Sequence, residues 1–184
     1  MTPFLNHPLA HGFARLRAIE ETDLMHWLGY LRSDPVRRGI SWRPQSTHEL
    51  REFVRATDLQ RPLSQVRFAI ARTDDDTLLG TIGLHSISRA HRSAEVGYDI
   101  APDQWGQGLA TAACRAIVAW AQLQGLVRIQ ATLLIGNHAS LRVLERAGFE
   151  QEGRLRKYRW IEGQACDVLV YSHLPGPTSA DLAR

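Results

Sequence analysis

Residues 95–111 read EVGYDIAPDQWGQGLAT, and they join a strand pattern to a helix pattern through a glycine-rich turn. Apolar and polar residues alternate up to Ile100, as in a strand, and Pro102 ends that pattern. Gly106 and Gly108 then lead into a long run with apolar residues at helical spacing. The first amide N–H groups of such a helix lack partners and lie at the positive end of its dipole. The stretch therefore predicts a cradle for an anion such as a phosphate, the alternative being a helix that merely begins with glycines.

Two other glycine-rich phosphate loops fit this stretch poorly. A P-loop carries a lysine and then Ser or Thr after its glycines, and the only lysine of this chain is Lys157. A Rossmann fingerprint needs a third glycine at its sixth position and a parallel sheet. That position is Thr111 here, and the pattern before the turn predicts antiparallel hairpins.

The pattern on both sides of the stretch predicts a mixed α/β domain. Helices are expected at residues 20–30, 46–56, 106–124 and 137–147. Strands are expected at residues 13–19, 66–72, 77–87, 93–102 and 127–135, and in a closing hairpin over residues 149–174. This order implies a largely antiparallel central sheet flanked by helices, with one parallel strand-helix-strand unit in the middle. We expect one domain over residues 13–174, an irregular segment at 1–12 and a flexible tail at 175–184.

The composition fits a globular protein and narrows its compartment and ligands. Of 184 residues, 44% are hydrophobic and 22% charged, which excludes a disordered, collagen-like or coiled-coil chain. Cys114 and Cys166 are too few for a disulfide framework, which indicates a reducing compartment. With no signal-peptide pattern and no apolar run of about 20 residues, we expect a soluble cytoplasmic protein that does not bind a membrane. The net charge is +3, and the basic side chains are arginines except for Lys157, which favours an anionic ligand. No patch of arginine and aromatic residues indicates nucleic-acid binding.

Two blocks of sequence resemble the GNAT acetyltransferases, and in particular their RimJ/RimL-type branch. The block Trp105-Gly106-Gln107-Gly108-Leu109-Ala110 is similar to the acyl-CoA pyrophosphate loop of that family, Gln/Arg-x-x-Gly-x-Gly/Ala, with Trp105 in place of Gln or Arg. The block Asn137-His138-Ala139-Ser140, followed by Leu144-Glu145 and Gly148-Phe149, is similar to the Asn-x-x-Ser helix of the branch. Blocks near both ends are similar too: Arg15-Leu16-Arg17…Asp23 and Glu152-Gly153…Tyr158…Gly163…Asp167. The resemblance covers about residues 13–174.

The resemblance implies a sheet that splays open between the strand ending at Ile100 and the strand ending at Ile135. The pantetheine arm of acetyl-CoA would lie in this splay, against the backbone of Tyr98, Asp99 and Ile100. The pyrophosphate would contact the backbone amides of Gly106, Gln107, Gly108, Leu109, Ala110 and Thr111. Asn137, an expected helix N-cap, would contact the pantetheine side. No metal is expected, since His85 and His138 are isolated.

The implied reaction is direct attack of an amine on the thioester, which needs a neutral amine, a stabilised oxyanion and a proton for the thiolate. Strand alternation places Glu95 and Asp99 on one face. Glu95 is the first candidate for the base and Asp99 the second, and pairing with an arginine is the structural alternative for Glu95. Ser140 is the candidate acid, or only a helix cap, because Leu144 stands where many relatives carry a tyrosine. Candidate substrate contacts are Trp42 and Tyr158.

The ionisation of amines favours one class of acceptor. At pH 7, deprotonating an α-amine of pKa about 7.7–8.0 costs about 1–1.4 kcal/mol, whereas a lysine near 10.4 costs about 4.6 kcal/mol. We therefore expect the N-terminal α-amine of a protein, of the ribosomal-protein type, as the acceptor. The alternatives are a small-molecule amine (a polyamine, amino acid or antibiotic) and a non-catalytic CoA-binding module. The closing hairpin also offers an edge that could pair with a second copy in a homodimer.

Overall fold

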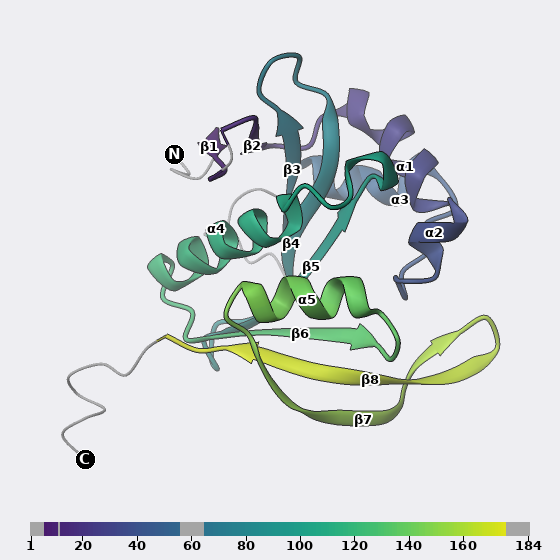
Figure 1. The fold of residues 1–184 in the computed structure, drawn as a ribbon, viewed down its shortest axis with the longest axis vertical. Coiled ribbons are helices and arrows are strands. Elements are labelled where there is room, and N and C mark those ends of the chain that lie inside the picture. Colours follow the sequence, from purple (N-terminus) through teal and green to yellow (C-terminus); the bar gives the residue numbers. More distant parts are fainter. Residues whose placement is uncertain (1–5, 11, 56–64, 176–184) are drawn as a thin grey trace.

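A computed structural model describes residues 6–10, 12–55 and 65–175. Within them, eight strands form one sheet in the order β1-β2-β3-β4-β5-β6-β8-β7 (Figure 1). The strands are β1 (His7–Pro8), β2 (Ala14–Arg17), β3 (Val66–Arg72), β4 (Leu78–Ser88), β5 (Ser93–Ile100), β6 (Arg128–Leu134), β7 (Glu150–Ile161) and β8 (Gln164–His173). Among the strand pairs of the described residues, only β5–β6 is parallel. The expected mixed α/β fold with one parallel unit is confirmed.

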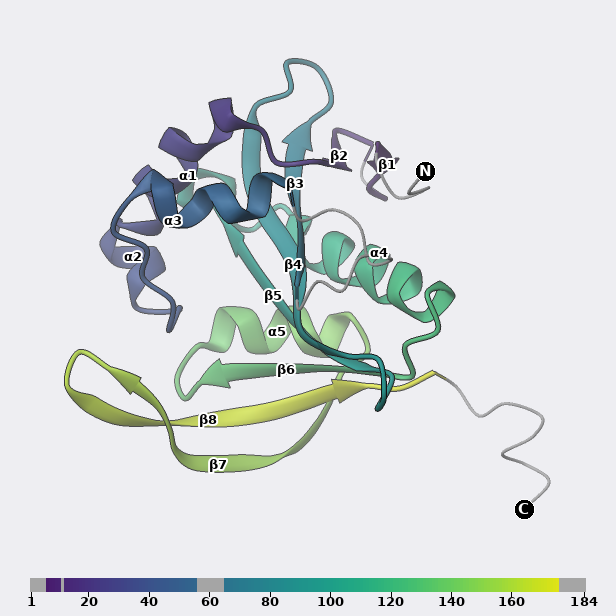
Figure 2. The same ribbon diagram turned by 180° about the vertical axis from the view of Figure 1, so that it is seen from behind.

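Helices cover both faces of this sheet (Figures 1 and 2). The helices are η1 (Glu21–Asp23), α1 (Leu24–Leu31), α2 (Asp34–Arg37), α3 (Thr47–Leu50), η2 (Arg51–Arg55), η3 (Pro102–Gln104), α4 (Leu109–Leu123) and α5 (His138–Arg146). Figure 1 shows α4 and α5 on the face toward the viewer, and Figure 2 shows α1 and α3 on the opposite face. In the described part of the chain, no helix has the length and apolar character to cross a membrane.

Three local features differ from the sequence expectation. The helix expected at residues 46–56 is α3 followed by the tighter turns of η2, and residue 56 lies outside the described residues. Helix α2 is absent from the expected helices; Ser33 has extended backbone angles and Pro35 lies in the first turn, where proline favours a helix start. The expected irregular segment contains the short strand β1. Residues 1–5 and the tail from 176 lie outside the described residues.

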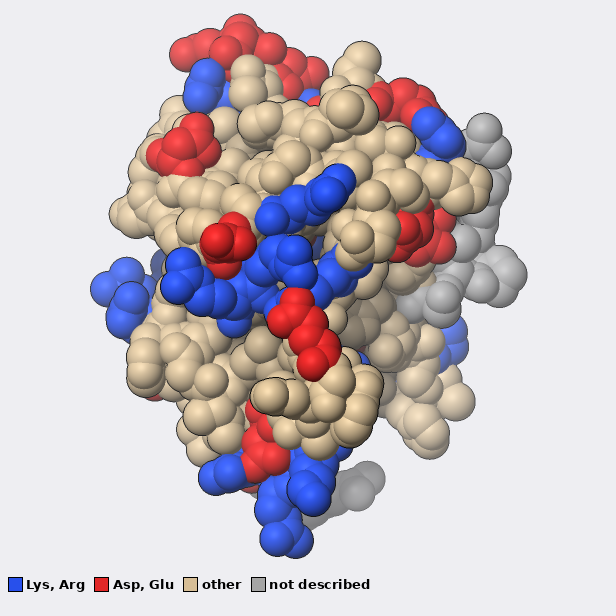
Figure 3. All heavy atoms as spheres, turned by 90° about the vertical axis from the view of Figure 1, so that its right-hand side faces the viewer, with Lys and Arg blue, Asp and Glu red and all other residues tan. Residues whose placement is uncertain are grey.

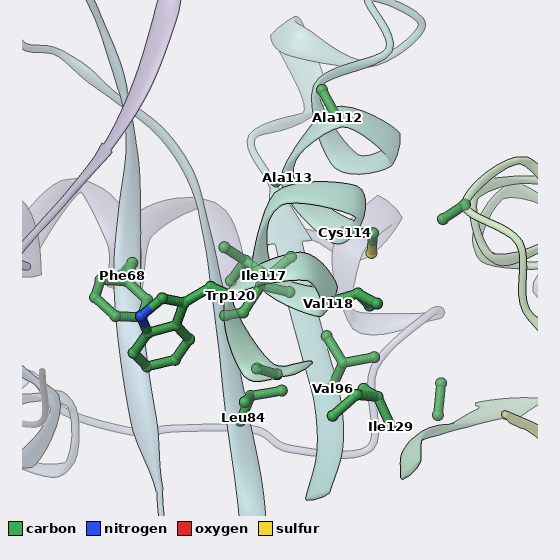
Figure 4. Close-up of a cluster of buried hydrophobic side chains, with 14 of the residues drawn as sticks. Phe68, Leu84, Val96, Ala112, Ala113, Cys114, Ile117, Val118, Trp120 and Ile129 are labelled. Atoms are coloured by element: carbon green, nitrogen blue, oxygen red, sulfur yellow. The ribbon is translucent and has the colours of Figure 1, made fainter. Parts of the chain in front are cut away.

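The main core fixes α4 against the sheet. Ile117 and Trp120 of α4 are buried among Phe68 and Leu84 of β3 and β4 (Figure 4). The Phe68 and Trp120 rings meet edge to face, with centroids 5.4 Å apart. Burying each large apolar side chain contributes roughly 1.5–3 kcal/mol. This packing holds the N-terminus of α4 beside the end of β5.

The sheet opens between β5 and β6. Their parallel pairing joins only residues 93–95 to residues 128–130. Beyond that point β5 stays paired with β4 as far as Ile100, while β6 stays paired with β8 as far as Leu134. The two halves of the sheet therefore separate into the V-shaped splay that the resemblance implied.

Candidate active site

Two cavities meet where β5 and β6 separate. The coenzyme cavity, of about 730 Å³, lies between the end of β5, the turn before α4 and the start of α5. The acceptor cavity, of about 420 Å³, is lined by β3, β4, β5 and β6 and by the segment around Trp42. Six residues line both cavities and form the junction: Gly39, Ile40, Tyr98, Asp99, Asn137 and Ser140. Molecules held in the two cavities would therefore touch at the junction.

The coenzyme cavity has the chemistry of an anion site. Its lining contains every predicted coenzyme contact except Gln107, whose side chain donates to Gln104 instead. Gly106 and Gly108 have φ of 81° and 78°, a conformation that favours glycine. Helix α4 begins without a side-chain cap, so the amides of its first turn remain available. Three arginines line the same cavity: Arg38, Arg142 and Arg146.

Trp105 explains the departure from the usual loop pattern. Its indole Nε1 donates to the carbonyl oxygen of Ile100 at 2.8 Å. The bond ties the turn before α4 to the last residue of β5. Tryptophan thus fixes the loop against the strand whose end forms the junction.

Asn137 and Ser140 hold the start of α5 at the junction. Asn137 Oδ1 accepts from the Ser140 amide at 3.0 Å, which confirms Asn137 as the N-cap, and its Nδ2 donates to the Gly39 carbonyl at 3.0 Å. The Tyr98 hydroxyl donates to the Ser140 carbonyl at 3.2 Å. Burial raises the pKa of Tyr98, so its phenol stays protonated. Cys114 is buried in α4 and its thiol pKa is raised by burial, as befits a packing residue.

Glu95 lines the acceptor cavity and is also held by polar partners. The Thr132 hydroxyl donates to its Oε1 at 2.5 Å, and Gln130 Nε2 donates to its Oε2 at 3.4 Å. Arg159 Nη2 lies 3.4 Å from Oε1. The Glu95 side chain is 6% exposed and lies beside Arg159, so the expected pairing with an arginine is present at a residue of the cavity lining.

Asp99 has a different environment from Glu95. Its carboxylate accepts from Tyr30 and Arg67 at 2.5 Å each, from Thr81 at 2.8 Å and from Trp27 at 3.2 Å. Four donors surround a side chain that is 3% exposed. The Asp99 carboxylate therefore joins α1 to the sheet, at a residue that borders both cavities.

The two candidate substrate contacts lie in different places. Trp42 lines the acceptor cavity and packs edge to face against Trp27 and Phe53. Tyr158, on β7, is 48% exposed and stacks on Arg159, outside the lining of either cavity.

The turn between β7 and β8 is tied to α2 beside the acceptor cavity. Arg37 Nη2 donates to Glu162 Oε1 at 2.7 Å, and Arg43 contacts the same carboxylate. Figure 3 shows basic and acidic side chains meeting on this face of the molecule. The contacts join two segments that are distant in the sequence, residues 37–43 and the turn at Glu162.

Sequence reasoning missed four charged or titratable residues of the acceptor cavity: Glu52, Arg67, His85 and Arg159. His85 pairs with Glu95 across β4 and β5, and its Nε2 lies 3.9 Å from Glu95 Oε1. Burial is the main cause that lowers the pKa of His85 from its ordinary 6.5. This pairing depends on the register of β4 and β5, which shifts between His85 and Ser88 and which no local sequence pattern gives.

Comparisons with known proteins agree with this geometry. Residues 14–150 match the family described as the acetyltransferase (GNAT) domain. An uncharacterized N-acetyltransferase of Bacillus subtilis, YoaA, is 41% identical over 108 residues, 58% of this chain and 61% of that protein. A ribosomal-protein-serine acetyltransferase of Escherichia coli is 30% identical over 101 residues, 54% of this chain and 56% of that protein. The crystal structure of spermidine N-acetyltransferase from Vibrio cholerae in complex with CoA and spermine superposes with a TM-score of 0.75 at 26% identity, covering 88% of this chain and 95% of that one. The chain thus spans less than two thirds of the two sequence relatives.

Proposed function

The chain belongs to the GNAT acetyltransferase family, and from this we propose that it is an acetyl-CoA-dependent N-acetyltransferase acting on the N-terminal α-amine of a protein. The observation that carries the proposal is the junction, where a cavity lined by three arginines and the start of α4 meets a second cavity at the open edge of β5. Direct transfer needs a donor and an acceptor to meet in this way.

The coenzyme cavity suits acetyl-CoA as the acetyl donor. The pyrophosphate would bind the free amides at the start of α4, and Arg38, Arg142 and Arg146 would balance its charge. Beyond Glu95, the edge of β5 that faces the splay is unpaired by β6, which leaves backbone groups for the pantetheine amides and for the thioester oxygen.

Proton transfer is assigned to the two sides of the junction. Ser140 lines both cavities and is placed to give its hydroxyl proton to the departing thiolate. The amine would lose its proton on the side of the acceptor cavity, whose lining includes Glu95. No nucleophilic cysteine is involved.

The charges of the acceptor cavity favour an acceptor with one amine over a polycation. Its lining carboxylates are Glu52, Glu95 and Asp99, and its guanidinium groups are Arg67 and Arg159. Arg67 is paired with Asp99, and Arg159 lies beside Glu95. The one carboxylate in excess suits a single ammonium group, whereas a polyamine would need several carboxylates.

The two cysteines are free, which supports a reducing, cytoplasmic setting.

An acceptor panel tests the proposal. The full chain and acetyl-CoA are mixed with peptides bearing a free Ser or Ala N-terminus, with N-terminally blocked lysine peptides, and with spermidine, and the free thiol of CoA is followed. We expect turnover with the free N-terminus alone. Preference for spermidine would select the small-molecule alternative, and CoA binding with no turnover on any amine would select the binding module.

A matched pair of serine variants tests the assigned acid. Ser140→Ala should lower kcat by about 100-fold while CoA binding by calorimetry stays unchanged. Ser46→Ala, at the start of α3 and outside both cavities, should leave both quantities unchanged. Full kcat in Ser140→Ala would remove Ser140 from the proton transfer.

A further inference from the structure

His85 occupies the floor of the acceptor cavity, beside the middle of β5. A Cβ added to Gly97 would lie 3.6 Å from His85 Nε2 on one side and 3.8 Å from Arg67 Nη1 on the other. The glycine therefore leaves an open space, flanked by an imidazole and a guanidinium, on the face of β5 that also carries Glu95. The side chain of His85 is 38% exposed, so a molecule in the cavity can reach it.

The hydrogen bonds divide the roles of His85 and Glu95. The Glu95 carboxylate already accepts from Thr132, Gln130 and Arg159. In contrast, within the described part of the chain, His85 Nε2 makes no hydrogen bond, and Nδ1 lies 3.2 Å from Ser86 Oγ. With its proton on Nδ1, donated to Ser86, the imidazole presents the Nε2 lone pair to the cavity.

We propose that His85 is the catalytic base that takes the proton directly from the attacking amine, and that Glu95 is a positioning residue that stabilises the imidazolium. This inference rests on the proposed function and names the proton acceptor within it. Glu95 Oε1, 3.9 Å from Nε2, lies close enough to favour the charged ring electrostatically once it forms.

The charged groups around His85 fit this role. Glu95 on β5 faces it, as do Arg67 on β3 and Arg159 on β7, and Glu52 of η2 lines the same cavity. Burial lowers the pKa of the imidazole, Glu95 opposes that change, and the two arginines add to it. The ring is therefore neutral at pH 7 and free to accept a proton.

The transfer conserves atoms and protons. The amine nitrogen forms the new C–N bond with the thioester carbon, and the C–S bond breaks with its electron pair on sulfur. One N–H proton passes to His85 Nε2, and the sulfur takes the Ser140 hydroxyl proton. The imidazolium then returns its proton to the Ser140 oxygen through water. The products are the acetylated amine and the free thiol of CoA.

The pH dependence of kcat/KM for His85→Gln tests the proposal in the full chain, with acetyl-CoA and the accepted peptide of the panel. We expect the wild-type rate to fall at acid pH, below the ordinary histidine pKa of 6.5. His85→Gln should lose this acid limb and about 100-fold in kcat, with CoA binding by calorimetry unchanged. His91→Gln, on the exposed turn between β4 and β5, should match the wild type.

A second variant separates His85 from Glu95 as the base. In Glu95→Gln the acid limb should remain and move to lower pH, because Glu95 raises the pKa of His85. Loss of the limb in Glu95→Gln would make Glu95 the base and overturn the proposal. Unchanged kcat and pH profile in His85→Gln would also overturn it while leaving the proposed function intact, whereas a wild type that acetylates no amine would overturn both.

A measurement on the wild type tests the proposal even where the His85→Gln variant does not fold. The His85 imidazole signal, followed by NMR, should titrate with the midpoint of the acid limb. A midpoint that differs by more than about one pH unit would contradict the proposal.

Discussion

Replacing Asp99 by asparagine should destabilise the protein strongly. The carboxylate is 3% exposed and accepts from Arg67 and Thr81 through Oδ2 and from Tyr30 and Trp27 through Oδ1. An asparagine can keep the Oδ1 contacts, but its amide NH₂ would face the donors of Arg67 and Thr81. The variant therefore leaves the guanidinium of Arg67, which is 11% exposed, without its counter-charge.

The expected loss follows from breaking a buried ion pair by removing one partner, which costs about 3–5 kcal/mol. For a chain of this length, each kcal/mol lowers Tm by about 2–4 °C, so Tm should fall by roughly 6–20 °C. Asp103→Asn is the matched control, because Asp103 is exposed and its carboxylate accepts from the neighbouring Gln104. Its effect should stay within about 0.5 kcal/mol.

Urea unfolding followed by circular dichroism measures both variants. The double variant Asp99→Asn/Arg67→Gln should lose less than the sum of the two single variants, since it removes both charges. A loss below about 1 kcal/mol in Asp99→Asn, or additive losses in the double variant, would refute the view that this ion pair joins α1 to the sheet.

Two further predictions concern the coenzyme loop and the edge of the sheet. Gly106→Ala and Gly125→Ala each put a Cβ at a positive φ, 81° and 86°, in open space. Each should lower the free energy of unfolding by about 1–2 kcal/mol, but only Gly106→Ala should weaken CoA binding by calorimetry; equal CoA affinities would contradict the cradle. Arg128 and Ser172 lower the pKa of Glu152 from 4.5 to about 2, so its stabilising effect is present above pH 4.5 and is lost as the pH falls toward 2. Glu152→Gln should make Tm depend less on pH over that interval, and the difference should correspond to less than about 1 kcal/mol of stability. A pH dependence of Tm like that of the wild type would argue against the ion pair.

The sequence predicts the elements whose signal is local. Strand β3 is expected at residues 66–72 and spans Val66–Arg72. Its bounds are predictable because its apolar residues and the turn beside it are both local signals. Helix α2 is only four residues long, and its start signal, Ser33 before Pro35, resembles a simple turn. Its helical form comes from the packing of Val36 in the core beneath it.

The same distinction applies to the site. The cradle at Gly106 and Gly108 and the cap at Asn137 were predictable, since a helix start depends on adjacent residues. The contact of His85 with Glu95 depends on the register of β4 and β5, which shifts between His85 and Ser88. A shift of one residue changes which side chains share a face, so no local pattern could have placed them together.

The splay leaves an open edge of β5, and such an edge favours binding of an extended molecule that contains amides. Within the described residues, β6 leaves one edge of β5 without a strand partner from Val96 onward, at a point where side chains from both faces enclose the strand. A buried backbone donor or acceptor without a partner costs about 1–3 kcal/mol. Glu95 and Thr132 bond across the vertex of the splay, and Asn137 bonds to Gly39 at the junction. A ligand with its own amides would supply the partners that β6 does not, which supports the proposal that acetyl-CoA binds along this edge.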